Sequence, residues 1–268
     1  MNISEIMTTT VSTITSDKSV SFAAEKMNAY STDALVVVDH GELMGVVTSR
    51  QLRSTHPNRI VADAMNVLPI RISPEDDVWE THALLQEHDD ELLLVMNEEE
   101  LVGVVTREDV QLKVAEFIDP LTGLYRAPYI QYMGEKLLRE GKPFHMLFID
   151  VNDFGKINKQ YGHPFGDDVI RMFSVALSEW QSNGDTYLCR YAGDEFVMIT
   201  TASDEWVKEC METIDKPTPI NDVMVSAAVG HLDGFREPDF FDKPLREHIA
   251  RASLLSTKAK MNKESMQL

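Results

Sequence analysis

Three carboxylates in the second half of the chain have the residue types and the spacing that a metal site requires. Asp150 ends an apolar stretch, and Asp194 and Glu195 follow Gly193 between two apolar stretches that are predicted as strands. A strand end beside a hairpin tip would bring these side chains together near backbone amides. Mg²⁺ takes carboxylates, water and substrate phosphates as ligands, so the pattern predicts a site for a metal-bound nucleoside triphosphate and for nucleotidyl transfer.

Each of these residues also has a purely structural interpretation. Gly193-Asp194 is a common turn pair, and Asp150 could cap the segment that follows it. The order of segments is more specific than any single residue. The motif Asp119-Pro120-Leu121-Thr122-Gly123-Leu124 precedes them, and Tyr161-Gly162-His163-Pro164-Phe165-Gly166-Asp167 lies between them.

The elements that must position these residues alternate between helices and strands. Helices are predicted at 128–140, 166–180, 204–214 and 245–260, and strands at 145–150, 187–191, 196–200 and 223–230. This mixture predicts an α/β sheet with helices packed on it.

The first half contains an internal repeat. Gly45-Val46-Val47-Thr48 recurs 58 residues later as Gly103-Val104-Val105-Thr106, and the same shift relates Met7 to Met65. Each copy reads as strand, helix, strand, strand and a short helix. The predicted ranges are 11–15, 20–30, 34–38 and 43–48 in the first copy, and 69–73, 78–88, 92–96 and 101–106 in the second. One copy is too small to bury its sheet, so the two copies should pack together.

The repeat resembles a tandem pair of cystathionine-β-synthase-type (CBS) domains, which implies an adenine nucleotide in the clefts between the copies. The resemblance assigns the ribose and phosphate contacts to Thr106 and Asp109, in Thr106-Arg107-Glu108-Asp109. The first copy has Gln51 where Asp is expected, so at most one cleft is well equipped. The alternative is that Thr-x-x-Asp and Thr-x-x-Gln are only helix capping boxes.

The second half resembles the GGDEF family of diguanylate cyclases across nearly all of residues 119–268. The residues that carry the resemblance are DPLTGL, YGHPFGD and the loop AGDEF preceded by Arg190-Tyr191. It implies an α/β (α+β) domain with a central, mainly antiparallel sheet flanked by helices. The expected division is repeat 1 at 1–58, repeat 2 at 59–117 and the GGDEF domain at 118–268, joined by the predicted helical segment 108–117.

The resemblance implies that two GTP molecules are joined into cyclic di-GMP by a homodimer that uses Mg²⁺ or Mn²⁺. It assigns the metal to Asp150 and Asp194, with Glu195 beside the metal or activating the 3′-hydroxyl. The expected GTP contacts are Asn158 and Asp167 for the guanine, and Gly193 and Lys260 for the phosphates.

Two departures from the family pattern support an alternative, a degenerate domain that binds GTP or another nucleotide and acts as a signalling switch. Gly155 replaces a phosphate-contacting Lys, with Lys156 adjacent, and Glu264 falls where Arg is usual. Asn183-Gly184-Asp185-Thr186 stands in place of the R-x-x-D of product-inhibited cyclases, so no such inhibition is expected. A following phosphodiesterase domain is not expected either.

Composition limits the classes of partner. The 25 Lys and Arg residues against 44 Asp and Glu give a formal charge of −19. That charge repels a phosphate backbone, so nucleic acid is not an expected partner. Cys189 and Cys210 are too few for a disulfide framework. A signal peptide and a run of roughly 20 apolar residues are both missing, so we expect a cytoplasmic protein without a membrane segment.

Overall fold

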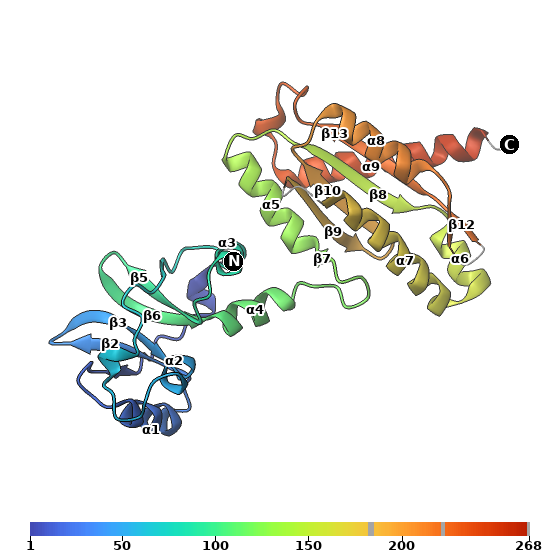
Figure 1. Ribbon diagram of the computed structural model, residues 1–268. Coiled ribbons are helices and arrows are strands. Elements are labelled where there is room, and N and C mark those ends of the chain that lie inside the picture. The colour runs from blue at the N-terminus through green and yellow to red at the C-terminus, as the bar shows by residue number, and fades with distance from the viewer. Residues whose placement is uncertain (182–184, 221–222, 267–268) are drawn as a thin grey trace. The chain divides into compact units, whose positions relative to one another are not determined.

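The computed structural model describes residues 1–181, 185–220 and 223–266. The chain divides into two compact units, Met1–Glu116 and Phe117–Leu268 (Figure 1). Helices and strands alternate in both units, which confirms the predicted α/β class. None of the described helices is long and apolar enough to cross a membrane.

The first unit consists of two copies of the same five elements. The first copy is β1 (Thr13–Ile14), α1 (Val20–Tyr30), β2 (Ala34–Asp39), β3 (Glu42–Thr48) and α2 (Ser49–Arg53). The second copy is β4 (Arg71–Ile72), α3 (Val78–Glu87), β5 (Leu92–Asn97), β6 (Glu100–Thr106) and α4 (Arg107–Ala115). The helix predicted at 108–117 therefore ends two residues early.

The strand register repeats along with the sequence. Thr13 pairs with Val36 in the first copy, and Arg71 pairs with Leu94 in the second, so each partner is displaced by the same 58 residues. Val36 and Val46 of the first copy share one hydrophobic core with residues of β5. The two sheets thus bury against each other the apolar faces that neither could bury alone.

The second unit is built on a five-stranded sheet in the order β13-β8-β10-β9-β7. Its strands are β7 (Tyr125–Arg126), β8 (His145–Val151), β9 (Thr186–Ala192), β10 (Glu195–Thr200) and β13 (Ala227–Asp233), and a separate hairpin is formed by β11 (Thr218–Ile220) and β12 (Val223–Val225). All neighbours in the large sheet are antiparallel except β7 and β9. The sequence predicted one strand at 223–230, which the structure divides into β12 and β13.

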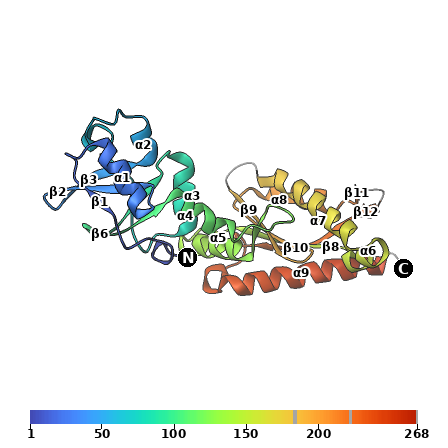
Figure 2. The ribbon, with the colours of Figure 1, turned by 90° about the horizontal axis from the view of Figure 1, so that it is seen from below.

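Helices cover both faces of this sheet. They are α5 (Ala127–Arg139), α6 (Phe154–Tyr161), α7 (His163–Ser178), α8 (Asp204–Asp215) and α9 (Leu245–Met266). Leu147 and Ile149 of β8 point into the core shared with α6, α7 and α8, whereas Met146 and Phe148 point into the core shared with α5 and α9. Figure 2 shows α9 on one side of the sheet and α7 and α8 on the other.

The packing of α9 on the sheet is close. A Cβ atom added to Gly230 of β13 would lie 1.9 Å from the carbonyl oxygen of Ala252 in α9, so only glycine allows the backbones to approach. This contact fixes the position of the helix that carries Lys260.

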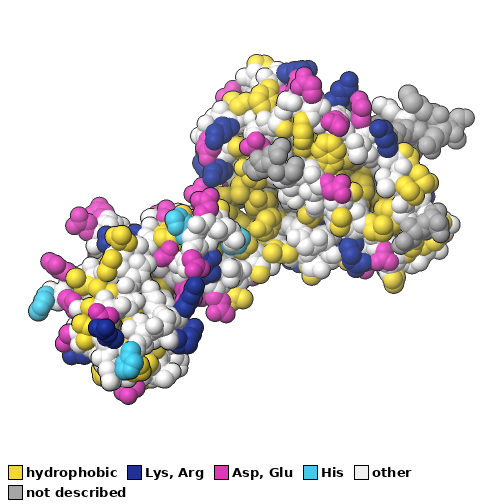
Figure 3. Space-filling model, viewed as in Figure 1, with side chains coloured by type: hydrophobic (Ala, Val, Ile, Leu, Met, Phe, Trp, Pro, Cys, Tyr) yellow, Lys and Arg dark blue, Asp and Glu magenta, His cyan; other side chains and the backbone are white. Residues whose placement is uncertain are grey.

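Charged side chains of both signs remain on the surface, with acidic groups over both units (Figure 3).

Candidate functional site

The strand register brings two of the predicted carboxylates together. Asp150 of β8 pairs directly with Glu195 of β10, and such cross-strand partners have Cβ atoms about 5 Å apart. Asp150 continues the face of β8 that packs on α9. Lys260 of α9 therefore reaches it, and its Nζ donates a hydrogen bond of 2.7 Å to Asp150 Oδ1. The sequence placed Lys260 against phosphate, and in the structure its partner is Asp150.

Asp194 lies at the turn between β9 and β10, next to the end of β8. Its carbonyl oxygen accepts a hydrogen bond of 3.2 Å from the backbone amide of Val151. Gly193 has φ +49°, a left-handed conformation that glycine adopts without strain. The Gly193 carbonyl accepts a hydrogen bond of 2.9 Å from Arg190 Nε, which holds the tip of the turn.

Arg190 also links this turn to the start of the unit, a role that the sequence analysis did not find. Its Nη1 lies 2.9 Å from Asp119 Oδ1, and both side chains are largely buried. Asp119 also accepts hydrogen bonds from the amide and the hydroxyl of Thr122. Although burial alone would raise the pKa of Asp119, the hydrogen bonds from Arg190 and Thr122 outweigh it and lower the pKa.

The three carboxylates repel one another. Burial raises the pKa of Asp194, and the negative charge of Asp150 raises it further. Burial also raises the pKa of Glu195, with Asp150 and Asp194 adding to the effect. Lys260 opposes both shifts. The cluster therefore attracts cations, of which Lys260 supplies one in the protein alone, and its all-oxygen donor set suits Mg²⁺ or Mn²⁺.

Asn158 presents a buried acceptor that no described residue satisfies. Its Oδ1 has no hydrogen-bond partner in the described part of the chain. It packs against Gly166, where an added Cβ atom would lie 1.9 Å from this oxygen. An unpaired buried polar atom is costly, and a ligand N–H group would remove that cost. Asp167, the residue that follows Gly166, is exposed on the first turns of α7.

Asn152 is a second candidate that the sequence analysis did not single out. Its amide nitrogen donates a hydrogen bond of 2.9 Å to Ser226 Oγ, which anchors the segment after β8 to the sheet. Its Oδ1 is buried and lacks a partner among the described residues. The feature of the sequence that could have indicated this residue is an asparagine two positions after Asp150.

The departures from the family pattern are visible in part. Gly155 is exposed, and a Cβ atom added there would meet none of the described atoms within 4 Å. The neighbouring Lys156 lies 2.6 Å from Asp153. The side chain of Glu264, and Asn183 and Gly184 of the segment compared with R-x-x-D, lie outside the described residues.

The first unit contains two clefts at equivalent positions of the repeat. One, of about 360 Å³, is lined by Thr8, Asp33, Thr106 and Asp109 among others. The other, of about 580 Å³, is lined by the residues 58 positions away, Asn66, Glu91, Thr48 and Gln51. Both volumes fall in the range of small-molecule sites.

The two clefts differ in their polar groups. Thr106 and Asp109 form a capping box, in which the amide of Thr106 donates to Asp109 Oδ2 at 3.0 Å. Thr48 and Gln51 form the equivalent box. The capping interpretation is therefore confirmed for both copies, and Thr106 and Asp109 also face a cleft. In the other cleft, Arg50 already pairs with Asp89 at 3.0 Å.

Comparison with known families matches both units. The model described as "Diguanylate cyclase, GGDEF domain" matches residues 116–230, and the CBS domain model matches residues 3–56 and 61–116. The predicted combination of a CBS pair with a GGDEF domain is thereby confirmed.

Curated relatives and solved structures match only part of the chain. "Response regulator PleD" of Caulobacter vibrioides is 38% identical over 85 residues, 30% of this chain and 18% of that protein. "Diguanylate cyclase DosC" of Escherichia coli is 31% identical over 121 residues, 44% of this chain and 24% of that protein. The chain thus spans less than a quarter of either relative.

Among solved structures, the chain is similar to the diguanylate cyclase SiaD of Pseudomonas aeruginosa, which was determined in complex with its activator SiaC. The two are 21% identical with a TM-score of 0.48, and the match covers 58% of this chain and 62% of SiaD. A CBS-domain protein, ATU1752 of Agrobacterium tumefaciens, is 21% identical with a TM-score of 0.39, and the match covers 41% of this chain and 88% of that one.

The repulsion among the carboxylates predicts a stabilising substitution. Because the folded state raises the pKa of Asp194, the folded chain holds its proton to higher pH than the unfolded chain, and stability falls as pH rises through these pKa values. Asp194→Asn removes this penalty. In EDTA at pH 7 we expect a gain of about 0.5 kcal/mol, kept small by solvent screening.

Denaturant titrations at several pH values measure this gain, which should shrink toward pH 4 as the carboxyl group is protonated. Added Mg²⁺ should then stabilise the wild-type protein more than Asp194→Asn. Equal Mg²⁺ stabilisation of the two proteins would contradict the assignment of Asp194 to the metal.

Proposed function

Because the chain carries two CBS domains followed by a GGDEF domain, we propose that it is a diguanylate cyclase that joins two GTP molecules into cyclic di-GMP under the control of a nucleotide at the CBS pair. The family of its second unit supports a role in cyclic di-GMP signalling. The observation that carries the proposal is the cluster of Asp150, Asp194 and Glu195 created by the pairing of β8 with β10.

The cluster supports the binding of a metal–triphosphate complex. Asp150 and Asp194 would hold Mg²⁺ or Mn²⁺, which supplies charge neutralisation for the phosphates. Lys260 would then leave Asp150 and turn its ammonium group to the triphosphate. Gly193, which has no side chain at the exposed turn, allows a phosphate to approach the backbone.

Asn158 and Asp167 would select the base. The unpaired Asn158 Oδ1 accepts from a ring N–H or amino group, and Asp167 accepts from a second donor. Guanine offers adjacent N–H donors on one edge, whereas adenine does not. A site whose buried acceptor is left unpaired by the wrong base discriminates strongly against it.

The reaction joins two nucleotides held by two domains. The 3′-hydroxyl oxygen of each GTP attacks the α-phosphorus of the other, a new P–O bond forms, and pyrophosphate leaves from each. Glu195, whose pKa is raised, would take the proton of the 3′-hydroxyl. Each domain holds one GTP, so catalysis requires a homodimer.

One observation favours the alternative of a nucleotide-binding switch without turnover. Gly155 supplies no side chain to the open space in front of it, so one cation that faces phosphate in the family is missing. In that alternative the domain binds GTP tightly and forms no product. The intact carboxylate cluster makes the cyclase the better supported of the two.

We expect wild-type protein with GTP and Mg²⁺ to form cyclic di-GMP, and Asp194→Ala to lower the rate by about 100-fold or more, because loss of the metal removes several kcal/mol of charge stabilisation. Chromatography of the products measures this.

Asp168→Asn is the matched control, since Asp168 is a carboxylate on α7 that pairs only with the neighbouring Arg171 in the described contacts. It should keep the wild-type rate. Equal turnover by wild type and Asp194→Ala would refute the cyclase. Tight GTP binding without product in a verified dimer would favour the switch.

For the first unit we propose an adenine nucleotide in the cleft lined by Thr106 and Asp109. The start of α4 suits a phosphate, and the Asp109 carboxylate can accept from ribose hydroxyls. The Thr106 hydroxyl donates a hydrogen bond of 2.6 Å to Asp109 Oδ2, so a bound nucleotide would compete with the capping box for these two side chains. In the other cleft Gln51 takes the place of Asp109, and Asp89 and Glu91 surround Arg50. The cleft lined by Thr106 and Asp109 is therefore the better nucleotide site.

The repeat supplies a matched pair of variants for this proposal. Asp109→Ala and Gln51→Ala each remove the N3 side chain of an equivalent capping box and leave the N-cap threonine in place, at a cost of about 1 kcal/mol. AMP, ADP or ATP should raise the melting temperature of wild type and of Gln51→Ala, whereas Asp109→Ala should lose most of the shift. The absence of any shift in the wild type, or an equal loss in both variants, would contradict the assignment.

A further inference from the structure

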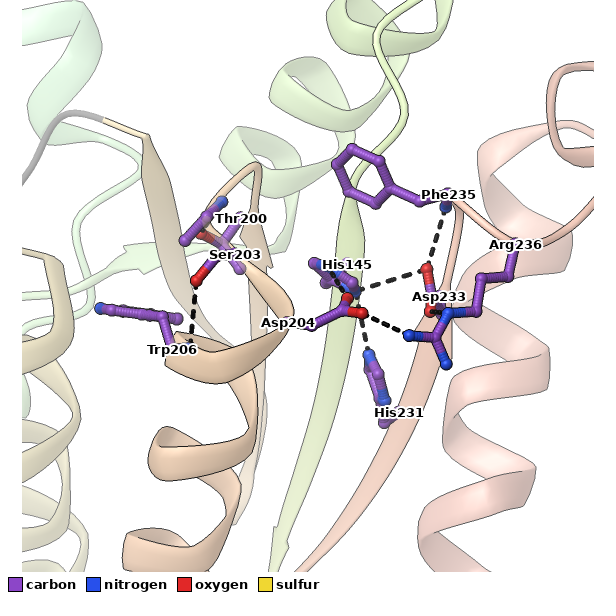
Figure 4. Close-up of polar contacts among 10 residues, drawn as sticks. His145, Thr200, Ser203, Asp204, Trp206, His231, Asp233, Phe235 and Arg236 are labelled. Atoms are coloured by element: carbon purple, nitrogen blue, oxygen red, sulfur yellow. Dashed lines mark hydrogen bonds and ion pairs between the residues drawn. The ribbon is translucent and has the colours of Figure 1, made fainter.

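A second group of charged and imidazole side chains lies at the other end of the central sheet. His145 begins β8, His231 and Asp233 lie near the end of β13, and Asp204 begins α8 (Figure 4). The register pairs Asp233 with His145. His145 is five residues from Asp150 along β8, about 17 Å, so this group is separate from the nucleotide site.

Imidazole and carboxylate atoms converge on His145, which is 1% exposed. Its Nδ1 lies 3.1 Å from His231 Nε2 and 3.6 Å from Asp233 Oδ1. Its Nε2 lies 3.4 Å from Asp204 Oδ1. Three potential ligand atoms, one from each of His145, Asp204 and Asp233, all lie within 4.8 Å of one another.

An imidazole gives an ion one nitrogen, so the relevant separations are those from His145 Nδ1, 3.1 Å to His231 and 3.6 Å to Asp233, and both are close to the separations around a tetrahedral ion. Asp204 lies on the Nε2 side of the ring and would have to turn toward an ion held by Nδ1. Two ligand atoms at bond lengths of about 2.0 Å from Zn²⁺ are about 3.3 Å apart. Burial lowers the pKa of His145 and of His231, so both rings favour the neutral form, which has a lone pair to offer.

Neighbouring elements hold the carboxylates in place. Ser203 Oγ accepts a hydrogen bond of 3.3 Å from the amide of Trp206 and caps α8, which fixes the direction of Asp204 (Figure 4). Asp233 Oδ1 accepts one of 3.0 Å from the amide of Phe235.

A single cation bridges the two carboxylates. Arg236 Nε lies 3.1 Å from Asp233 Oδ2, and its Nη2 donates to Asp204. The Arg236 side chain is 72% exposed and lines a cavity of about 380 Å³ together with Asp204, His231 and Asp233. Arg236 can therefore swing into solvent and leave both carboxylates and the His231 imidazole facing the cavity, with the buried His145 behind them.

We propose that His145, His231, Asp204 and Asp233 form a binding site for a divalent transition-metal ion such as Zn²⁺. Two imidazoles and two carboxylates suit such an ion, whereas Mg²⁺ prefers oxygen ligands alone. The ion would join the start of β8, the end of β13 and the first turn of α8. The competing explanation is an ion-pair network completed by Arg236. This proposal does not depend on cyclase activity.

The two explanations predict opposite effects of Arg236→Ala. If the site binds a metal, removal of the competing guanidinium tightens binding by about threefold or more, the effect of an exposed cation near the carboxylates. If the group is only an ion-pair network, the variant is destabilised and gains no metal affinity.

The test uses Co²⁺ as a spectroscopic substitute for Zn²⁺ on the full chain, with excess Mg²⁺ present to occupy hard-oxygen sites. We expect one equivalent of Co²⁺ with the intense visible absorption of tetrahedral coordination. His231→Gln and Asp233→Asn should each weaken binding about tenfold or more. His88→Gln, an exposed histidine next to Asp89 and Asp90 in the other unit, should change nothing.

Folding is checked by circular dichroism. If Asp233→Asn fails to fold, because it also loses the hydrogen bond from Phe235, His231→Gln and Arg236→Ala still decide the question. Co²⁺ binding that is unchanged in His231→Gln, or absent from wild type and Arg236→Ala, would overturn the proposal.

Discussion

The burial of β8 on both faces is the constraint on which the second unit depends. Met146, Leu147, Phe148 and Ile149 are at most 2% exposed, so the strand can carry polar groups only at its ends. His145 occupies one end and Asp150 the other. The neighbouring strands obey the same constraint, which collects Asp233 beside His145 and Glu195 beside Asp150. One buried strand therefore creates two polar sites, and their chemistry differs because one end gathers imidazoles and the other gathers carboxylates.

The first unit reaches a similar result by duplication. Two copies in the same register bury one shared core and leave two equivalent clefts. Thr48 and Thr106 cap the equivalent helix of each copy. The residue three positions later then decides whether a cleft offers a carboxylate, as Asp109 does, or an amide, as Gln51 does. The two copies therefore share the helix cap but offer different polar groups to a ligand.

Much of this was predictable from the sequence because it depends on local pattern. The repeat, the class of the fold and the meeting of Asp150 with Glu195 follow from apolar periodicity and from acidic residues at strand ends. The helix α6 was not predicted, since it begins after Asp153 in a left-handed conformation and contains Gly155 in its first turn. The long-range partners were also missed. Arg190 and Asp119 are 71 residues apart, and His145 and His231 are 86 apart, so only the folded chain reveals these contacts.

The central claim is that the carboxylates at the end of β8 form a metal and nucleotide site whose charge Lys260 balances in the protein alone. A crystal structure with Mn²⁺ and a non-hydrolysable GTP analogue tests it most directly. The account predicts an anomalous Mn²⁺ signal between Asp150 and Asp194, the guanine against Asn158, and Lys260 released from Asp150 to the phosphates. Mn²⁺ and nucleotide bound elsewhere, with the Lys260 bond to Asp150 intact, would contradict it.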